Sequence, residues 1–172
     1  MLDRPLILTG FMGSGKSSVG RVLAEQLGCS FVDLDAQIVA TAGCSINEIF
    51  ATGGEQAFRT MESDCLERTL GGDISVIATG GGVVIGDENR RSMRRSGVVV
   101  NLLVSLPLVL ERLHGTMDRP LFAGDNGANS VKLLMDAREQ FYADADIRID
   151  TDGKSVEDVA AEILRFLEEL HA

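Results

Sequence analysis

A glycine-rich segment near the amino terminus has the residue types and the spacing of a phosphate-binding loop. Gly10–Ser17 reads GFMGSGKS and matches the pattern G-x-x-x-x-G-K-[S/T] without a gap. In this pattern the glycines let backbone N–H groups point at phosphate oxygens, the lysine reaches the terminal phosphates, and the last hydroxyl binds Mg²⁺. An ordinary glycine-rich turn is the alternative, but a strand-like segment before the loop and a helix-like segment after it favour phosphate binding. The sequence therefore predicts a nucleoside triphosphate site in which Lys16 lies on an exposed loop.

Two aspartates follow the next apolar segment, in the sequence VDLDAQI. If the chain is extended there, the side chains of Asp33 and Asp35 point to opposite sides. We assign Asp33 to the metal ion, through a water molecule, and Asp35 to a substrate hydroxyl as an acid–base group. A pair of aspartates that caps the following helix is the commoner arrangement, so this motif alone leaves both interpretations open.

An arginine and a run of glycines lie further along the chain. Arg59 is part of FRTME on a predicted helix, where a surface arginine usually pairs with a nearby acid. Gly80, Gly81 and Gly82 follow an apolar segment, and such a run lets a ligand pack against the main chain. A tight turn is the alternative, although a turn seldom needs three glycines.

A polar segment from Gly115 to Ser130 is rich in glycine and is predicted to be a mobile loop. It contains DRPLF, in which Arg119 precedes a proline. A cation on a mobile loop can close over a phosphoryl group and exclude water. Arg138 lies on the helix predicted to follow. Taken singly, each of these two arginines is more often a surface residue than a site residue.

The composition narrows the class of protein. The chain has 172 residues, of which 45% are hydrophobic and 24% charged, and its net charge is −10. These values fit one compact domain and argue against nucleic acid or an anionic membrane as a partner. The three cysteines lack the spacing of a disulfide framework or a zinc site, which indicates a reducing compartment. The amino-terminal segment lacks the pattern of an export signal, so we expect a cytoplasmic protein, and by default a monomer.

The candidate residues depend on strands and helices that alternate along the chain. Strands are predicted at Leu6–Thr9, Phe31–Asp33, Ile74–Ala78, Val98–Leu103 and Ile147–Asp150. Helices are predicted at Ser17–Leu27, from near Ile46 to an interruption at Gly53-Gly54, and at Glu55–Leu70, Leu106–Leu113, Val131–Ala143 and 155–170. This alternation predicts an α/β fold of three layers, with a five-stranded parallel sheet covered by helices on both faces. Ligands bind beyond the carboxyl ends of the strands in such sheets, which is where most of the candidate residues fall.

In combination, the motifs GSGKS, DLD, FRTME, GGG and DRPLF, with an arginine before the last strand, resemble the shikimate kinase family of P-loop proteins. The resemblance covers nearly the whole chain. It implies one P-loop kinase domain over residues 1–172, with a lid at about 112–129 and substrate-binding helices at about 33–62. It also implies transfer of the γ-phosphate of ATP to the 3-hydroxyl of shikimate, with Mg²⁺, on the pathway to chorismate and the aromatic amino acids.

The resemblance assigns a role to each candidate residue. It implies that ATP is bound by Gly13, Ser14, Gly15, Lys16, Ser17, Ser18, Arg112, Arg119 and Lys154. It implies that Mg²⁺ is held by Ser17 and Asp33. Shikimate would contact Asp35, Arg59, Gly80, Gly81, Gly82 and Arg138. In this scheme the two arginines bind the carboxylate of shikimate, and Lys16, Asp35 and Arg119 are the catalytic residues.

Three other functions remain open from the sequence. A kinase for another polyol acid, such as gluconate, would use the same aspartate but would have less need of two arginines for a ring carboxylate. A nucleoside monophosphate kinase would need a second basic cluster, and no such cluster stands out. A regulatory protein that has lost catalysis is the third, although Lys16, Ser17, Asp33, Asp35 and Arg119 are all present.

Overall fold

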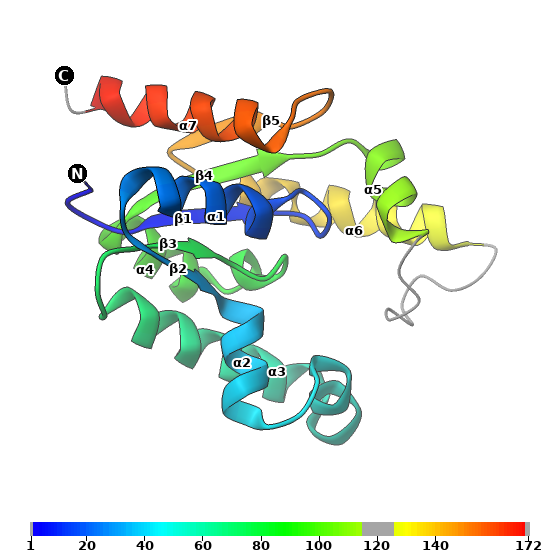
Figure 1. Ribbon diagram of the computed structural model, residues 1–172. Coiled ribbons are helices and arrows are strands. Elements are labelled where there is room, and N and C mark those ends of the chain that lie inside the picture. The colour runs from blue at the N-terminus through cyan, green and yellow to red at the C-terminus, as the bar shows by residue number, and fades with distance from the viewer. Residues whose placement is uncertain (1, 115–125, 171–172) are drawn as a thin grey trace.

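The computed structural model describes residues 2–114 and 126–170, which form a five-stranded sheet with helices on both faces (Figure 1). The strands are β1 (Leu6–Gly10), β2 (Ser30–Asp33), β3 (Ser75–Ala78), β4 (Val98–Leu103) and β5 (Ile147–Asp150). Their order is β2-β3-β1-β4-β5, and every neighbouring pair is parallel. The predicted α/β fold with a five-stranded parallel sheet is confirmed.

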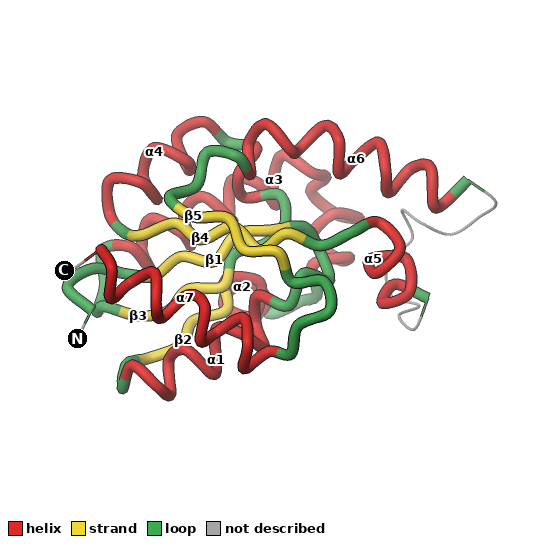
Figure 2. Tube along the Cα trace, turned by 90° about the horizontal axis from the view of Figure 1, so that it is seen from above, coloured by secondary structure: helices red, strands yellow, loops and turns green. Residues whose placement is uncertain are grey.

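The helices form a layer on each side of the sheet (Figure 2). They are α1 (Lys16–Leu27), α2 (Leu34–Ala42), α3 (Ile46–Leu70), α4 (Asp87–Ser96), α5 (Leu106–Leu113), α6 (Gly127–Tyr142) and α7 (Val156–Leu170), with a 3-10 turn, η1 (Val83–Ile85). Helices α1 and α7 cover one face, while α3, α4 and α6 lie on the other. None of these described helices combines the length and the apolar character that a membrane-spanning helix needs.

The central strand β1 shows why both faces of the sheet are buried. Its residues are all apolar or small, and alternate side chains point to opposite faces. Leu6 and Leu8 pack with α1 and α7, whereas Ile7 packs with the helices of the other layer. Burial on both sides holds β1 firmly, and the loop that follows its carboxyl end therefore starts from a fixed point.

Two helices, α4 and α2, were not among those predicted from the apolar pattern of the sequence, although a helix capped by the aspartate pair was left open. Helix α4 reads DENRRSMRRS, and its buried residues are Asn89, Ser92 and Met93. Because two of these three are polar, the helix lacks the apolar periodicity by which a packed helix is recognised. Helix α2 follows β2 without a loop, since the side chain of Asp33 caps it.

The structure differs from the sequence prediction at two helix boundaries, one within α3 and one at the start of α6. Helix α3 runs through the predicted interruption, but Gly54 has φ 74° and ψ −178°, so the helix is kinked there. Only glycine adopts such a backbone conformation at little cost. Helix α6 begins at Gly127, so residues 127–130 are helical, contrary to the prediction of a loop. The apolar pattern starts only at the buried Val131, and this is why the first turn was missed. The rest of the predicted loop, residues 115–125, lies outside the described residues.

Candidate active site

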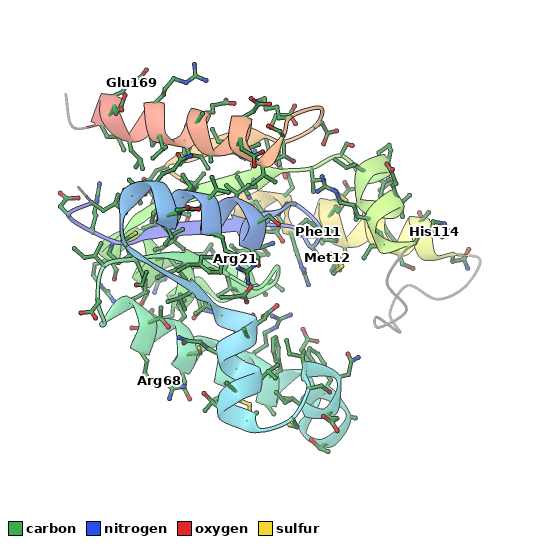
Figure 3. All side chains as sticks on the ribbon, in the orientation of Figure 1. Phe11, Met12, Arg21, Arg68, His114 and Glu169 are labelled. Atoms are coloured by element: carbon green, nitrogen blue, oxygen red, sulfur yellow. The ribbon has the colours of Figure 1, made fainter. Side chains whose placement is uncertain are left out.

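The glycine-rich loop joins β1 to α1 and leaves the first turn of α1 open to a ligand. Phe11 and Met12 follow β1 on the side of the molecule where α5 and α6 lie (Figure 3). Gly13 and Gly15 have positive φ angles of 76° and 91°, which bend the chain sharply. No side chain caps α1 at Gly15. The backbone N–H groups at the start of α1 are therefore available to an anion.

Lys16 is largely buried within this loop, contrary to the expectation of an exposed lysine. Its Nζ donates hydrogen bonds to the carbonyl oxygens of Gly10 at 2.7 Å and Phe11 at 3.1 Å, and lies 3.4 Å from Ser14 Oγ. The reason is that the loop curls around the lysine, so that its own carbonyl groups solvate the ammonium group. Ser18, in the first turn of α1, is exposed.

Ser17 and Asp33 are brought together from separate elements. Ser17 Oγ donates a hydrogen bond to Asp33 Oδ2 at 2.6 Å, and Asp33 Oδ1 accepts from the backbone N of Ala36 at 3.2 Å. Asp33 therefore does cap a helix while it faces the predicted metal ligand. A hydroxyl and a carboxylate beside a phosphate loop are oxygen ligands of the kind that Mg²⁺ prefers, so these two residues fit the ion.

Asp35 does not lie on an extended segment, and the prediction of alternating strand side chains is wrong at this point. It lies in the first turn of α2, because that helix starts directly after the capping residue Asp33. Asp35 nevertheless reaches the glycine run. A Cβ atom on Gly80 would lie 2.9 Å from Asp35 Oδ1 and 2.8 Å from Glu62 Oε2. Two carboxylates thus converge where Gly80 has no side chain.

Glu62 is a site residue to which the sequence interpretation gave no role. Its side chain is 1% exposed and accepts a hydrogen bond from Arg59 Nη1 at 2.8 Å, while Glu62 Oε2 is buried without a hydrogen bond to any described residue. Burial raises the pKa of Glu62 above its ordinary value, although the Arg59 charge lowers it. The spacing of Arg59 and Glu62, three residues apart on one helix, was the signal that could have identified this pair.

The two predicted arginines lie against the other two glycines. A Cβ on Gly82 would be 2.5 Å from Arg59 Nη2, and one on Gly81 would be 3.6 Å from Arg138 Nη1. Arg138 is 8% exposed, and its guanidinium carbon lies 5.8 Å from the centre of the Phe11 ring. A side chain at position 82 would displace Arg59, whereas one at position 81 would lie in van der Waals contact with Arg138. The glycine run is therefore a backbone surface on which both cations rest, next to the phosphate loop.

Tyr142 ties this surface to α6. Its hydroxyl donates a hydrogen bond to the carbonyl oxygen of Gly81. The ring is buried, and burial raises the pKa of the Tyr142 hydroxyl to about 12, against a smaller lowering by Arg138 one turn earlier. The hydroxyl therefore stays protonated at neutral pH and keeps its role as a donor. The sequence gave no sign of this contact, because residues 81 and 142 are far apart in the chain.

The remaining residues predicted to bind the nucleotide differ in whether the structure places them near the phosphate loop. Arg112, at the end of α5, donates a hydrogen bond to the carbonyl oxygen of Gly13 and so lies on the phosphate loop. Lys154 forms an ion pair with Glu162 at 2.6 Å, and no described contact joins it to the loop. Arg119 lies outside the described residues.

The buried Glu62 carboxyl leads to a prediction about stability and pH. Because its pKa in the folded chain lies above 4.5, the folded state binds this proton more tightly than the unfolded state. The contribution of Glu62 to stability is therefore fully present below the unfolded pKa and is lost as the pH rises through the folded pKa. Glu62→Gln cannot ionise. We expect its unfolding free energy, relative to wild type, to improve as the pH is raised from about 4.5 to about 7.

Urea unfolding at a series of pH values measures this difference. Glu55→Gln is the matched control, since Glu55 is an exposed carboxylate 3.5 Å from the same arginine. A Glu62→Gln difference that is constant with pH would contradict the prediction.

A family model, curated relatives and solved structures all match this chain to the same protein family. A family model described as shikimate kinase matches residues 12–168. The shikimate kinase of Geobacter sulfurreducens is 55% identical over 167 residues, which cover 96% of this chain and 92% of the relative. The solved structure of shikimate kinase from Acinetobacter baumannii in complex with shikimate is 35% identical, with a TM-score of 0.92, over 96% of this chain and 93% of that one. A second solved shikimate kinase, from Aquifex aeolicus, has a TM-score of 0.85 at 34% identity and covers 95% of this chain and 96% of its own.

Proposed function

The chain belongs to the shikimate kinase family and is an ATP-dependent kinase for shikimate, and we propose that it transfers the γ-phosphate to the 3-hydroxyl through the residues assembled above. One observation carries the assignment of residues. Asp35, Arg59 and Arg138 come from three helices and converge on the glycine run next to the phosphate loop. An aspartate for hydroxyl groups and two arginines for a carboxylate match the polarity of shikimate.

The phosphate loop binds ATP in this proposal. The backbone N–H groups of Gly13–Ser18 surround the phosphates, and the Lys16 ammonium group, already held at the loop, exchanges one carbonyl partner for the transferring phosphate. Arg112 lies beside the loop on the nucleotide side. Arg119 and Lys154 are assigned to ATP from their sequence positions, Arg119 as the lid cation on the phosphates.

The acceptor hydroxyl is held by Asp35. Its carboxylate accepts the hydrogen bond of the hydroxyl and takes the proton as the new phosphorus–oxygen bond forms. Arg59 and Arg138 fix the opposite end of the ring by paired hydrogen bonds to the carboxylate. Phosphoryl transfer depends mainly on such positioning and on charge stabilisation, so the rigid glycine wall is as important as the ionic groups.

Magnesium is assigned to the side of the loop where Ser17 and Asp33 meet. The Ser17 hydroxyl would bind the ion directly, and Asp33 would bind it through water. When bound, the ion would neutralise negative charge on the phosphate oxygens. The distance of 2.6 Å between the two side chains supports this assignment.

Other properties follow from the same proposal. One kinase domain spans residues 1–172, with a lid at about 112–129 and substrate-binding helices at about 33–62. The three cysteines are unpaired, which supports a cytoplasmic location. We propose a monomer that binds neither nucleic acid nor membranes.

The first test is release of ADP from Mg·ATP in a coupled assay, with shikimate, quinate and gluconate each added separately. Strong stimulation by shikimate alone is expected. Stimulation by gluconate, or by none of the three while ATP still binds, would overturn the proposal.

The arginine that contacts Gly82 makes the choice of substrate testable. Arg59→Ala removes one partner of the shikimate carboxylate and should raise the KM for shikimate by about a hundredfold, because a charged hydrogen-bonding group is lost. The KM for ATP should change little. Arg91→Ala, on the exposed part of α4, is the control. An equal rise in both KM values would contradict a carboxylate-binding role.

The hydroxyl of Tyr142 should support the same subsite. Tyr142→Phe keeps the ring but leaves the Gly81 carbonyl without its donor, so we expect the KM for shikimate to rise by about tenfold, at unchanged KM for ATP. Steady-state kinetics with each substrate varied in turn measures this effect. An unchanged KM for shikimate would show that the glycine run holds its position without the tyrosine.

A further inference from the structure

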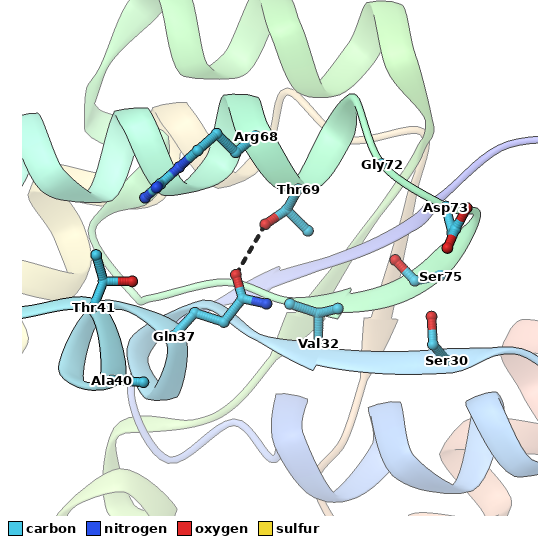
Figure 4. A pocket seen from close by; sticks show the side chains of 10 residues that line it. All are labelled: Ser30, Val32, Gln37, Ala40, Thr41, Arg68, Thr69, Gly72, Asp73 and Ser75. Carbon is cyan, nitrogen blue, oxygen red and sulfur yellow. Dashed lines mark hydrogen bonds between the residues drawn. The ribbon is translucent and has the colours of Figure 1, made fainter.

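A second concave site lies away from the kinase residues, between α2, α3 and the edge of the sheet (Figure 4). It is an open groove of about 550 Å³. Its floor is formed at the amino-terminal ends of β2 and β3, whereas the kinase residues lie beyond the carboxyl ends of the strands. No step of the proposed reaction uses it.

The floor of the groove contains a buried hydroxyl without a partner. Ser30 and Ser75 are paired in register on β2 and β3, and Val32 lies two residues further along the same face. Ser75 is 0% exposed, and its Oγ forms no hydrogen bond with any described residue. A buried hydroxyl without a hydrogen bond lowers the stability of the fold. Most buried polar groups in folded proteins do form one, so this exception calls for an explanation. A ligand that hydrogen-bonds to the floor provides one.

One end of the groove is rich in hydrogen-bond donors. Gln37 Oε1 lies 3.3 Å from Thr69 Oγ1 and 3.5 Å from Cys65 Sγ, which leaves the side-chain NH₂ group facing the groove (Figure 4). Arg68 uses its Nε on the Asp64 carbonyl oxygen at 3.3 Å, and its guanidinium forms no ion pair within the described part of the chain. A cation and an amide NH₂ together suit a carboxylate.

The opposite end carries the opposite charge. Figure 4 shows Asp73 at the far end of the groove from Arg68. Asp73 also forms no ion pair with a described residue, and the hydroxyls of Ser30 and Ser75 lie beside it (Figure 4). Val32 lies between the two ends, and Ala40 lines the groove near Thr41 (Figure 4). The groove thus presents a positive end, an apolar middle and a negative end.

We propose that this groove binds a small zwitterion whose carboxylate and ammonium groups are separated by an aliphatic spacer, as in an ω-amino acid. The carboxylate binds Gln37 and Arg68. The ammonium group binds Asp73 and the serine oxygens, and the spacer packs on Val32. A single anion or cation satisfies only one end, so both charges are required for full affinity. The site adjoins the two helices that carry Asp35, Arg59 and Glu62, but its occupation does not depend on catalysis.

The test is a titration of the whole chain, without ATP or shikimate, followed through backbone amide NMR shifts. The probes are β-alanine, 4-aminobutyrate and 6-aminohexanoate, which share the two charges and differ in spacer length. Butyrate and butylammonium carry one charge each. We expect saturable shifts at the groove residues at millimolar concentration for one spacer length, and affinity about tenfold weaker for either single-charge probe.

Variants at the two ends separate this site from a nonspecific effect. Arg68→Gln and Asp73→Asn should each weaken binding by about tenfold, whereas Arg91→Gln on α4 should leave it unchanged. The spectrum of each variant reports its folding directly. The proposal is overturned if no zwitterion gives saturable shifts at the groove, if butyrate or butylammonium binds as well, or if both end variants bind normally. The kinase assay, run in parallel, shows whether any failure is confined to the groove.

Discussion

A Lys16→Met enzyme should lose about a thousandfold in kcat, because a preorganised cation at the transferring phosphate is removed. Methionine keeps most of the aliphatic stem but cannot neutralise charge. In the structure the Lys16 ammonium group is already held at the loop by the Gly10 and Phe11 carbonyl oxygens. The lysine is therefore placed before any ligand binds, and its loss is a loss of preorganisation as well as of charge.

The fold should survive this change at a cost of about 1–2 kcal/mol, since hydrogen bonds within one loop are lost while the core is untouched. Lys132→Met is the control, because Lys132 is an exposed lysine that pairs only locally with Asp136 at 2.5 Å. Turnover at saturating substrates and thermal unfolding should be measured on both variants. An unchanged kcat in Lys16→Met would remove the lysine from the mechanism.

Asp35→Asn should lower kcat by about a thousandfold as well, with a smaller effect on the KM for shikimate. Asparagine preserves the shape of the side chain and can still hydrogen-bond to a hydroxyl, but it cannot accept the proton. Glu62 does not replace it, since its carboxyl is held by Arg59 at 2.8 Å and burial favours its protonated form.

The control for Asp35→Asn is Asp64→Asn, an exposed aspartate on α3. Both should be assayed at saturating ATP over a range of shikimate concentrations. If Asp35→Asn raises only the KM and keeps kcat, Asp35 binds the substrate without acting as the base. A large loss of kcat in the control would instead point to a general effect of charge on this face.

The sequence predicted the sheet well because β1, β3 and β4 are short, mainly apolar runs bounded by polar or glycine residues. It also predicted the loop from Gly10 to Ser17, because the residues of this pattern determine the backbone geometry of the loop locally. It failed where a residue's surroundings come from distant parts of the chain. Lys16 was expected on the surface because its burial by Gly10 and Phe11 depends on the path of the loop in space.

The roles of Glu62 and Tyr142 were missed because they depend on contacts between distant parts of the chain, which no sequence motif records. Glu62 becomes a site residue only when α2 brings Asp35 beside Gly80, and Tyr142 only when α6 packs on the glycine run. Asp35 reaches the glycine run, although from a helix and not from the extended segment that the sequence predicted. The turn of α2 delivers the carboxylate to the same place that the extended chain was expected to reach.

The order of the strands also determines when the chain can first bind a nucleotide during synthesis. Strand β1 and the phosphate loop are translated before β3 and β4, but Leu6 pairs with Val76 on one side and Val98 on the other. Until β3 and β4 have been translated, β1 has no neighbour in the sheet, and the loop has no fixed end from which to curl. ATP therefore cannot stabilise the nascent chain through this loop before both strands have been made. The pattern that identifies the loop is local, but the loop becomes usable only after two later strands have fixed the strand that precedes it.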